Sequence, residues 1–229
     1  MSTQTAGSVQ YGCGWQAPPN WLNFDSSLTL RFERLPFIGR LYTKNERRFP
    51  ENVLYGDIVK GLPIAKGSVA RLFASHVIEH LCYQDALLAL KRSHELLKPG
   101  ALFRLIVPDL KTRAQKYISA ADRNSAAAAI DFMRSTMLGR ERHPRGLRSV
   151  LVETFGGSHH LWMWDEASLS AVLHEQGFVN IRRCAFGDSE DPLFAEVEDP
   201  TRFIDGDIVE LAIECRRAPA AESFRIISL

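Results

Sequence analysis

The sequence has few of the features that mark secreted, membrane or nucleic-acid-binding proteins. Its four cysteines form no C-x-x-C pair, so we expect reduced thiols and neither a disulfide framework nor a structural zinc site. No apolar run approaches the roughly 20 residues that span a bilayer, and the start shows no secretory signal. The formal net charge is +1, so no global field recruits nucleic acid. We expect a cytoplasmic protein with no membrane span and no nucleic-acid partner.

The composition is that of one globular domain. The 229 residues are 45% hydrophobic and 24% charged, enough for one substantial core. Short apolar runs bounded by Gly or Pro alternate with helical patterns. Strands are expected at 8–11, 21–24, 53–55, 71–75, 101–107, 178–186 and 208–216, and helices at 84–97 and 165–176. This alternation predicts an α/β fold with a mostly parallel sheet covered by helices.

The two helices carry recognisable boundaries. The first should place Leu87, Leu90, His94 and Leu97 on one face and stop at the Lys-Pro-Gly sequence of residues 98–100. The second should begin at an Asp165 N-cap and end at Gly177.

Two segments, 27–52 and 110–157, fit the alternation poorly. Both follow the carboxyl ends of expected strands, where open α/β sheets bind ligands. We interpret them as lid or substrate insertions in a single domain, 1–229; packing decoration is the alternative.

The stretch SHVIEHL contains His76-x-x-Glu79-His80, the H-x-x-E-H signature of inverted zinc proteases. That chemistry needs both histidines on one helix. Residues 71–75 are expected to form a strand, so His76 falls at a strand end and need not share a face with His80. No distinctive acidic ligand follows downstream. The sequence therefore disfavours a protease, and we expect no metal site.

Other strand ends point to nucleotide chemistry. The first expected strand ends in Tyr11-Gly12-Cys13-Gly14, whose glycines let the backbone approach a ligand. Asp25 closes the second strand, where a carboxylate can accept hydrogen bonds from a ribose diol. Asp57 follows the third strand and could accept an adenine amino group.

With these strand ends, the chain resembles the class I S-adenosylmethionine (SAM)-dependent methyltransferases of the type-11 group. The carriers are YGCG, WLNFD, GDIVKGLPIAKGSVARLFASHVIEHL and LLKPGALFRLIVPDL, over residues 8–110, with 160–186 and the last strand. The resemblance implies a Rossmann-like three-layer sandwich with a mostly parallel seven-stranded sheet, one of whose last two strands is antiparallel, and helical lid insertions.

The resemblance also implies roles for individual residues around SAM. The loop Tyr11, Gly12, Cys13 and Gly14 would wrap its methionine part, and Asp25 would bind the ribose. Asp57 and Ile58 would frame the adenine, and Ser75 and His76 would lie beside the sulfonium.

One departure concerns the glycine loop. Ten residues separate Gly14 from Asp25, too few for the helix that usually follows, and a third glycine is missing. The dipole of a helix N-terminus is then unavailable to the cofactor carboxylate. Loop amides or an arginine from an insertion would have to replace it. The same absence argues against a dinucleotide oxidoreductase.

Methyl transfer requires alignment of an acceptor with the sulfonium and, for a hydroxyl, a base. His76 and His160 are the candidate bases; structural roles are the alternative. Trp162 could stack on the acceptor or pack in the core. Arg142 and Arg145, in an arginine-rich segment, could bind an anionic acceptor or be solvated.

The sequence therefore predicts a SAM-dependent methyltransferase acting on a hydroxyl of a small or glycan-like molecule. The glycan preference is what the resemblance implies. A non-catalytic SAM-binding module that serves a partner protein is the alternative.

Overall fold

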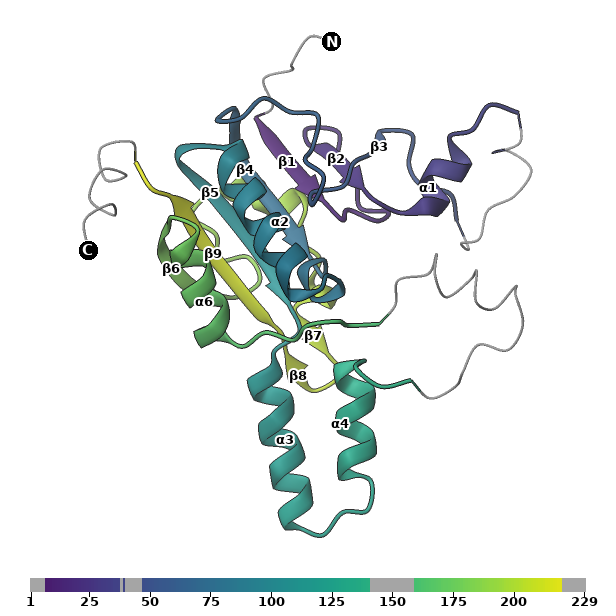
Figure 1. The fold of residues 1–229 in the computed structure, drawn as a ribbon, viewed down its shortest axis with the longest axis vertical. Coiled ribbons are helices and arrows are strands. Elements are labelled where there is room, and N and C mark those ends of the chain that lie inside the picture. Colours follow the sequence, from purple (N-terminus) through teal and green to yellow (C-terminus); the bar gives the residue numbers. More distant parts are fainter. Residues whose placement is uncertain (1–6, 38, 40–46, 141–158, 220–229) are drawn as a thin grey trace.

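A seven-stranded sheet forms the centre of the computed structural model, which describes residues 7–37, 39, 47–140 and 159–219 (Figure 1). The strand order is β3-β2-β1-β4-β5-β9-β6. The strands are β1 (Ser8–Tyr11), β2 (Leu22–Asp25), β3 (Val53–Tyr55), β4 (Val69–Ser75), β5 (Leu97–Val107), β6 (Phe178–Cys184) and β9 (Leu211–Arg217). β1 to β5 pair in parallel, and β9 runs antiparallel to both β5 and β6. The expected Rossmann-like α/β fold is confirmed.

Helices α2 (Tyr83–Leu96) and α6 (Glu166–Glu175) pack on one face of this sheet. The buried stripe of α2 is Ala86, Ala89, Leu90, Ser93 and Leu96, which is only partly the predicted face. The prediction of this face was wrong because the small side chains of Ala86, Ala89 and Ser93 let α2 approach the sheet closely, while the larger Leu87 is only partly buried. The helix also passes directly into β5 at Leu97, so the Lys-Pro-Gly stop lies inside the strand.

The boundaries of α6 agree with the sequence. Asp165 caps the helix by accepting a 2.8 Å hydrogen bond from the Ser168 amide, and Ser168 closes a reciprocal capping box. Gly177 follows with φ 89°, a left-handed conformation that glycine adopts without strain.

The prediction that residues 208–216 form one strand was wrong. Ile208–Val209 is β8, which pairs with β7 (Ile204–Asp205) in a separate hairpin, and β9 begins at Leu211. Between them the buried Glu210 carboxylate accepts hydrogen bonds from Arg113 and from the Asp109 amide, at 2.7–3.0 Å. These polar contacts separate the two strands.

The opposite face of the sheet is covered by an irregular segment, residues 185–203, which we call the strap. It includes two 3-10 turns, η3 (Pro192–Glu196) and η4 (Pro200–Arg202). Phe194, Val197 and Phe203 of the strap pack with Trp21, Phe73 and Leu102. No helix lies between β1 and β2, as the short loop predicted.

The insertions begin with helices. The first contains α1 (Leu28–Glu33), and the second begins as a hairpin of α3 (Leu110–Asp122) and α4 (Ala128–Thr136) that projects away from the sheet (Figure 1). Residues 141–158 lie outside the described residues. No helix in the described ranges is long and apolar enough to cross a bilayer. A lid function for either insertion stays a prediction.

Candidate functional site

A small cavity lies at the carboxyl ends of the adjacent strands β1 and β4. Its volume is about 90 Å³. Of the predicted cofactor-binding residues, it brings together Tyr11, Gly12, Cys13 and Ser75. The rest of its lining comes from Gln10, Trp15, Gln16, Arg47, Phe73, Asp199 and Arg202.

The two loop glycines have different surroundings. Gly12 has φ 67°, and a Cβ there would collide with the Val77 side chain, so the protein itself requires this glycine. Gly14 has φ 55°, and nothing lies within 4 Å of where its Cβ would stand. Gly14 is therefore the loop position that a ligand can approach closely.

Asp25 lies behind the loop rather than in the lining of the cavity. One carboxylate oxygen accepts a 3.0 Å hydrogen bond from the Gly14 amide, and the other accepts one of 2.8 Å from the Ser27 amide. Burial raises the pKa of Asp25, although both amides oppose the shift. Asp25 therefore fixes the glycine loop; ribose binding stays a prediction.

Asp57 and Ile58 follow β3, apart from the cavity lining. The Asp57 carboxylate accepts a 3.0 Å hydrogen bond from the Val59 amide and lies 3.2 Å from Lys60 Nζ. Ile58 is a core residue, 4% exposed. Contacts of this pair with adenine stay predictions.

Four lining groups bear directly on ligand chemistry: one hydroxyl, two guanidinium groups and one thiol. The Ser75 hydroxyl is buried and has no hydrogen-bond partner among the described residues. Arg47 comes from the first insertion and Arg202 from the strap, so the cavity has a cation on two of its walls. Burial raises the pKa of Cys13 to about 12, which keeps this thiol neutral.

His76 connects the end of β4 to the strap. Its Nδ1 lies 3.1 Å from Glu79 Oε1, and its Nε2 lies 3.0 Å from the Arg202 carbonyl oxygen. Burial lowers the pKa of His76, but Glu79 outweighs this effect and the net shift is upward. The backbone has φ 54°, an uncommon conformation for histidine. With both ring nitrogens engaged, His76 is arranged to position the strap.

His160 lies in a second cluster with Glu79 and His80. Glu79 and His80 belong to the short turn η2 (Ile78–His80). The Glu79 carbonyl accepts hydrogen bonds from the Leu161 and Trp162 amides, at 2.7 and 3.1 Å, which brings the His160 segment to η2. His160 is 7% exposed, and burial lowers its pKa.

The predicted acceptor-binding residues divide between described and undescribed regions. Trp162 is 43% exposed, with its ring centroid 4.7 Å from that of Tyr83; stacking on an acceptor stays a prediction. Arg142 and Arg145 lie outside the described residues, and their role stays a prediction.

Sequence reasoning missed Arg47, Asp199 and Arg202 as lining residues. The sequence predicted that loop amides or an arginine from an insertion would replace the missing helix N-terminus, but nothing in the sequence indicated that this arginine is Arg47. Asp199 and Arg202 reach the cavity through the fold of the strap, for which the local sequence offers only a turn signal.

Comparison with known proteins adds little beyond the fold. No protein-family model matches the chain, and no curated protein matches it. Solved structures that resemble it include SAM-dependent methyltransferases from Archaeoglobus fulgidus (11% identity, TM-score 0.47, covering 92% of this chain and 86% of that one) and Thermotoga maritima (14%, 0.46, 93% and 82%).

Another similar structure is a complex between the Trm112 methyltransferase activator of Haloferax volcanii and a methyltransferase (14% identity, TM-score 0.46, covering 94% of this chain and 84% of that one). These likenesses are distant, and the fold rests on the strand order itself. That order, with β9 antiparallel between β5 and β6, is the class I methyltransferase arrangement that the sequence resemblance implied.

Proposed function

We propose that the chain binds SAM at the carboxyl ends of β1 and β4 and transfers its methyl group to a hydroxyl of a small or glycan-like acceptor. One observation carries the proposal. Tyr11, Gly12, Cys13 and Ser75, assigned to the cofactor from two separate strand ends, line one cavity. That cavity lies where open parallel sheets bind ligands.

The lining fits the chemistry of the methionine end of SAM. The unpartnered Ser75 hydroxyl supplies a buried hydrogen-bonding group, and Gly14, which follows the lining residues Gly12 and Cys13, leaves open space next to the loop. Arg47 would hold the cofactor carboxylate by a charge-assisted hydrogen bond, in place of the missing helix N-terminus. Asp25 would support the site by holding the Gly14 amide in place.

The size of the cavity requires an opening step. Its volume of about 90 Å³ is well below the roughly 300–1,000 Å³ typical of sites for drug-sized ligands. We infer that the wall formed by Asp199 and Arg202 moves between its anchors, the buried Glu198 and Phe203, when the hydrogen bond from His76 to the Arg202 carbonyl opens.

When bound, SAM supplies an already activated methyl group. The task of the protein residues is then to align the acceptor and to exclude water. Trp162, exposed and packed beside Tyr83, would present an aromatic face to a sugar-like acceptor. If Arg142 and Arg145 bind the acceptor, the proposed acceptor is anionic. If they do not, it is neutral.

Calorimetry with S-adenosylhomocysteine tests cofactor binding. Arg47→Ala should weaken binding about ten- to hundred-fold, since hydrogen bonds to charged groups contribute about 1.5–3 kcal/mol. Arg31→Ala is the matched control, because Arg31 is also exposed but stacks over Tyr55 instead of lining the cavity. A folded wild-type protein that does not bind S-adenosylhomocysteine would overturn the proposal.

Turnover separates the enzyme from the non-catalytic module. The enzyme should release S-adenosylhomocysteine when SAM is supplied with one of a set of nucleotide sugars and neutral glycans. Binding of the cofactor without turnover on any acceptor would favour the module, a reading to which the shortened glycine loop lends support.

A further inference from the structure

Three potential metal ligands meet beside His76, which follows the carboxyl end of β4. Glu79 and His80 lie on η2. His160 follows the second insertion in the sequence, and the hydrogen bonds that the Glu79 carbonyl accepts from the next two residues bring it to η2. One donor atom from each residue can be chosen so that all three lie within 4.8 Å of one another. Among the described residues, no other group of three or more His, Cys, Asp or Glu side chains has such geometry.

Glu79 is the centre of this cluster and lacks normal partners. Its side chain is 0% exposed. Oε1 lies 3.1 Å from His76 Nδ1, which is within ion-pair distance, but neither oxygen makes an aligned hydrogen bond in the described part of the chain. A buried carboxylate without hydrogen bonds is costly, so this site favours an additional cation.

The two other residues present their imidazoles in a form suited to metal binding. His80 Nδ1 lies 3.1 Å from the His159 carbonyl oxygen, and His160 Nδ1 lies 2.8 Å from that of Thr136. An Nδ1–H that donates to a carbonyl leaves a lone pair on Nε2. Metal-bound histidines are commonly oriented by this kind of second hydrogen bond.

We propose that Glu79, His80 and His160 bind a divalent first-row transition-metal ion through one carboxylate oxygen and two Nε2 atoms. Two histidines and one carboxylate form a known ligand set for Zn²⁺. Imidazole ligands favour such ions over Mg²⁺ and Ca²⁺. Bonds of about 2.0–2.2 Å in a tetrahedron separate ligand atoms by about 3.4 Å, so donor atoms that now lie up to 4.8 Å apart must draw closer when the ion binds.

This ligand set differs from the one that the H-x-x-E-H motif suggests. The motif would pair His76 with His80 on one helix, whereas here His80 is paired with the distant His160. His76 instead lies against Glu79 as a charge partner. The sequence alone did not indicate this ligand set, because only the fold brings His160 to η2.

A three-ligand site leaves a coordination position for another molecule. If the proposed methyltransferase function holds, an acceptor hydroxyl bound there would lose its proton more readily, because metal ions lower the pKa of bound oxygen groups. This role rests on the proposed function; the binding of the ion does not.

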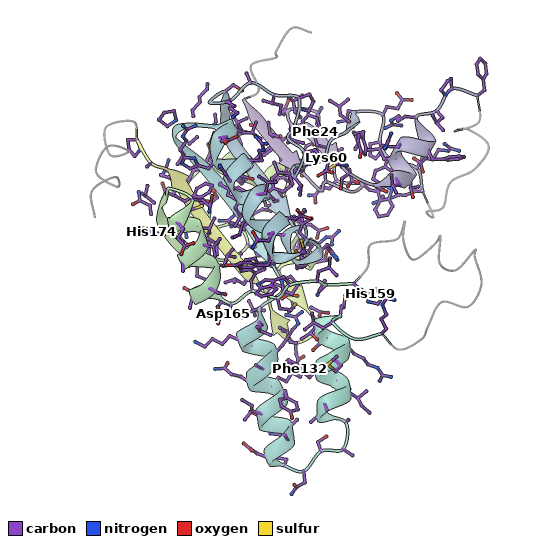
Figure 2. The ribbon with its side chains drawn as sticks, viewed as in Figure 1. Phe24, Lys60, Phe132, His159, Asp165 and His174 are labelled. Carbon is purple, nitrogen blue, oxygen red and sulfur yellow. The ribbon has the colours of Figure 1, made fainter. Side chains whose placement is uncertain are left out.

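Metal titration of the metal-free full chain tests the site. Calorimetry with Zn²⁺ and visible absorption with Co²⁺ should each find one ion per chain. Glu79→Gln and His160→Ala should each weaken binding at least about tenfold, whereas Mg²⁺ should not compete. His174→Ala is the control, because His174 is exposed on α6, well away from His159 beside the hairpin (Figure 2).

His76→Ala separates the two possible histidine pairs. We expect this variant to retain metal binding, because His76 is a neighbour of Glu79 rather than a ligand. Loss of binding in His76→Ala together with retention in His160→Ala would overturn the assignment in favour of the motif pair. Absence of saturable Zn²⁺ and Co²⁺ binding would overturn the site altogether.

Thermal unfolding shows whether each variant is folded before its metal binding is compared with that of wild type. Glu79→Gln keeps the shape of the side chain and removes a buried charge, so the metal-free variant should melt no earlier than wild type. Zn²⁺ should raise the melting temperature of wild type but not of Glu79→Gln. Calorimetry with S-adenosylhomocysteine on the same preparations reports the cofactor site independently, so failure of one proposal is distinguishable from failure of the other.

Discussion

The two faces of the sheet are closed by different means, although the same strands supply both. In β5, Phe103, Leu105 and Val107 point to the face covered by α2 and α6, which we call the helical face. The intervening residues Leu102, Arg104 and Ile106 point to the face covered by the strap. Alternation along a strand places these two sets on opposite sides.

The helical face is closed by apolar contacts. Helices α2 and α6 satisfy their own backbone groups, so their inner surfaces can be almost wholly apolar. Titratable groups on this side are shifted toward their neutral forms. Burial raises the pKa of Tyr11, whose hydroxyl lies 3.1 Å from Ser93 Oγ, and burial raises that of Cys215.

The strap covers its face with buried charges as well as apolar side chains. The Arg104 side chain is 0% exposed and contacts Glu198, Asp188 and Glu214. Burial lowers the pKa of Arg104, but Cys184, Glu198 and Glu214 outweigh it and the net shift is upward. The Arg104 guanidinium is therefore held in its charged form.

The difference follows from backbone chemistry. An irregular segment has no internal ladder to satisfy its amide and carbonyl groups, so buried side chains must do so. Arg104 donates a 2.6 Å hydrogen bond to the Ala185 carbonyl, and Glu198 accepts one of 2.9 Å from the Gly187 amide. Where helices are missing, polar side chains are the means by which a loop can cover a sheet.

The largest expected effect concerns Arg104. Replacement by leucine removes the guanidinium that pairs with the buried Glu198 and leaves Glu214 with Arg182, which should lower the free energy of unfolding by about 3–5 kcal/mol. Urea denaturation measures the loss. Arg182→Ala is the control: this arginine also contacts Glu214, at 2.6 Å, but is 35% exposed and should contribute about 1 kcal/mol or less.

A companion variant isolates the charge effect. Arg104→Leu combined with Glu198→Gln should recover part of the loss, because it removes one of the uncompensated carboxylates. A loss below about 1 kcal/mol for Arg104→Leu alone would mean that apolar contacts hold the strap, and the distinction between the faces would disappear.

A smaller effect compares apolar packing on the two faces. Ile106→Val on the strapped face and Ile213→Val on the helical face should each cost about 0.5–1.5 kcal/mol, because both side chains are 0–1% exposed. We expect similar values by urea denaturation. A negligible cost for Ile106→Val alone would show that the strap packs loosely and that the polar network carries most of its attachment.

The sheet was predictable because each strand is marked by signals in its own short stretch of sequence. Apolar alternation, the Asp165 cap and Gly177 are short-range signals, and each appears in the structure close to its expected place, whereas the Lys-Pro-Gly sequence lies inside β5. The missing helix between β1 and β2 was predictable from loop length alone. Local signals were sufficient to place α2 and α6 along the chain, but not to identify which face of α2 packs on the sheet.

The strapped face was not predictable because its contacts are non-local. Arg104 and Glu198 are 94 residues apart, and nothing in either neighbourhood indicates the other. The same limit applies to the site: the sequence identified His80 and His160 individually but could not place them together. Strand-end residues such as Tyr11 and Ser75 were easier, because parallel strands end at one edge of the sheet.

The smallest expected effect concerns His94 on the helical face. Its ring packs edge-on against Phe178, with centroids 5.2 Å apart. Burial, followed by the nearby charge of Arg217, lowers the pKa of His94 below its ordinary value of 6.5. The unfolded chain therefore binds more protons than the folded one between these two pKa values, and stability falls as the pH drops below 6.5.

His94→Gln should remove this contribution. Urea denaturation at pH 7.5 and 5.5 should show a shallower decline for the variant than for wild type, with a difference below about 1.4 kcal/mol per pH unit, the limit for one proton. His76, whose pKa is raised, acts in the opposite direction above pH 6.5, so the comparison is between the two proteins and not the absolute slope. The exposed His174→Gln serves as control. An unchanged slope in His94→Gln would mean that the helical face tolerates a proton on this ring, contrary to its apolar character.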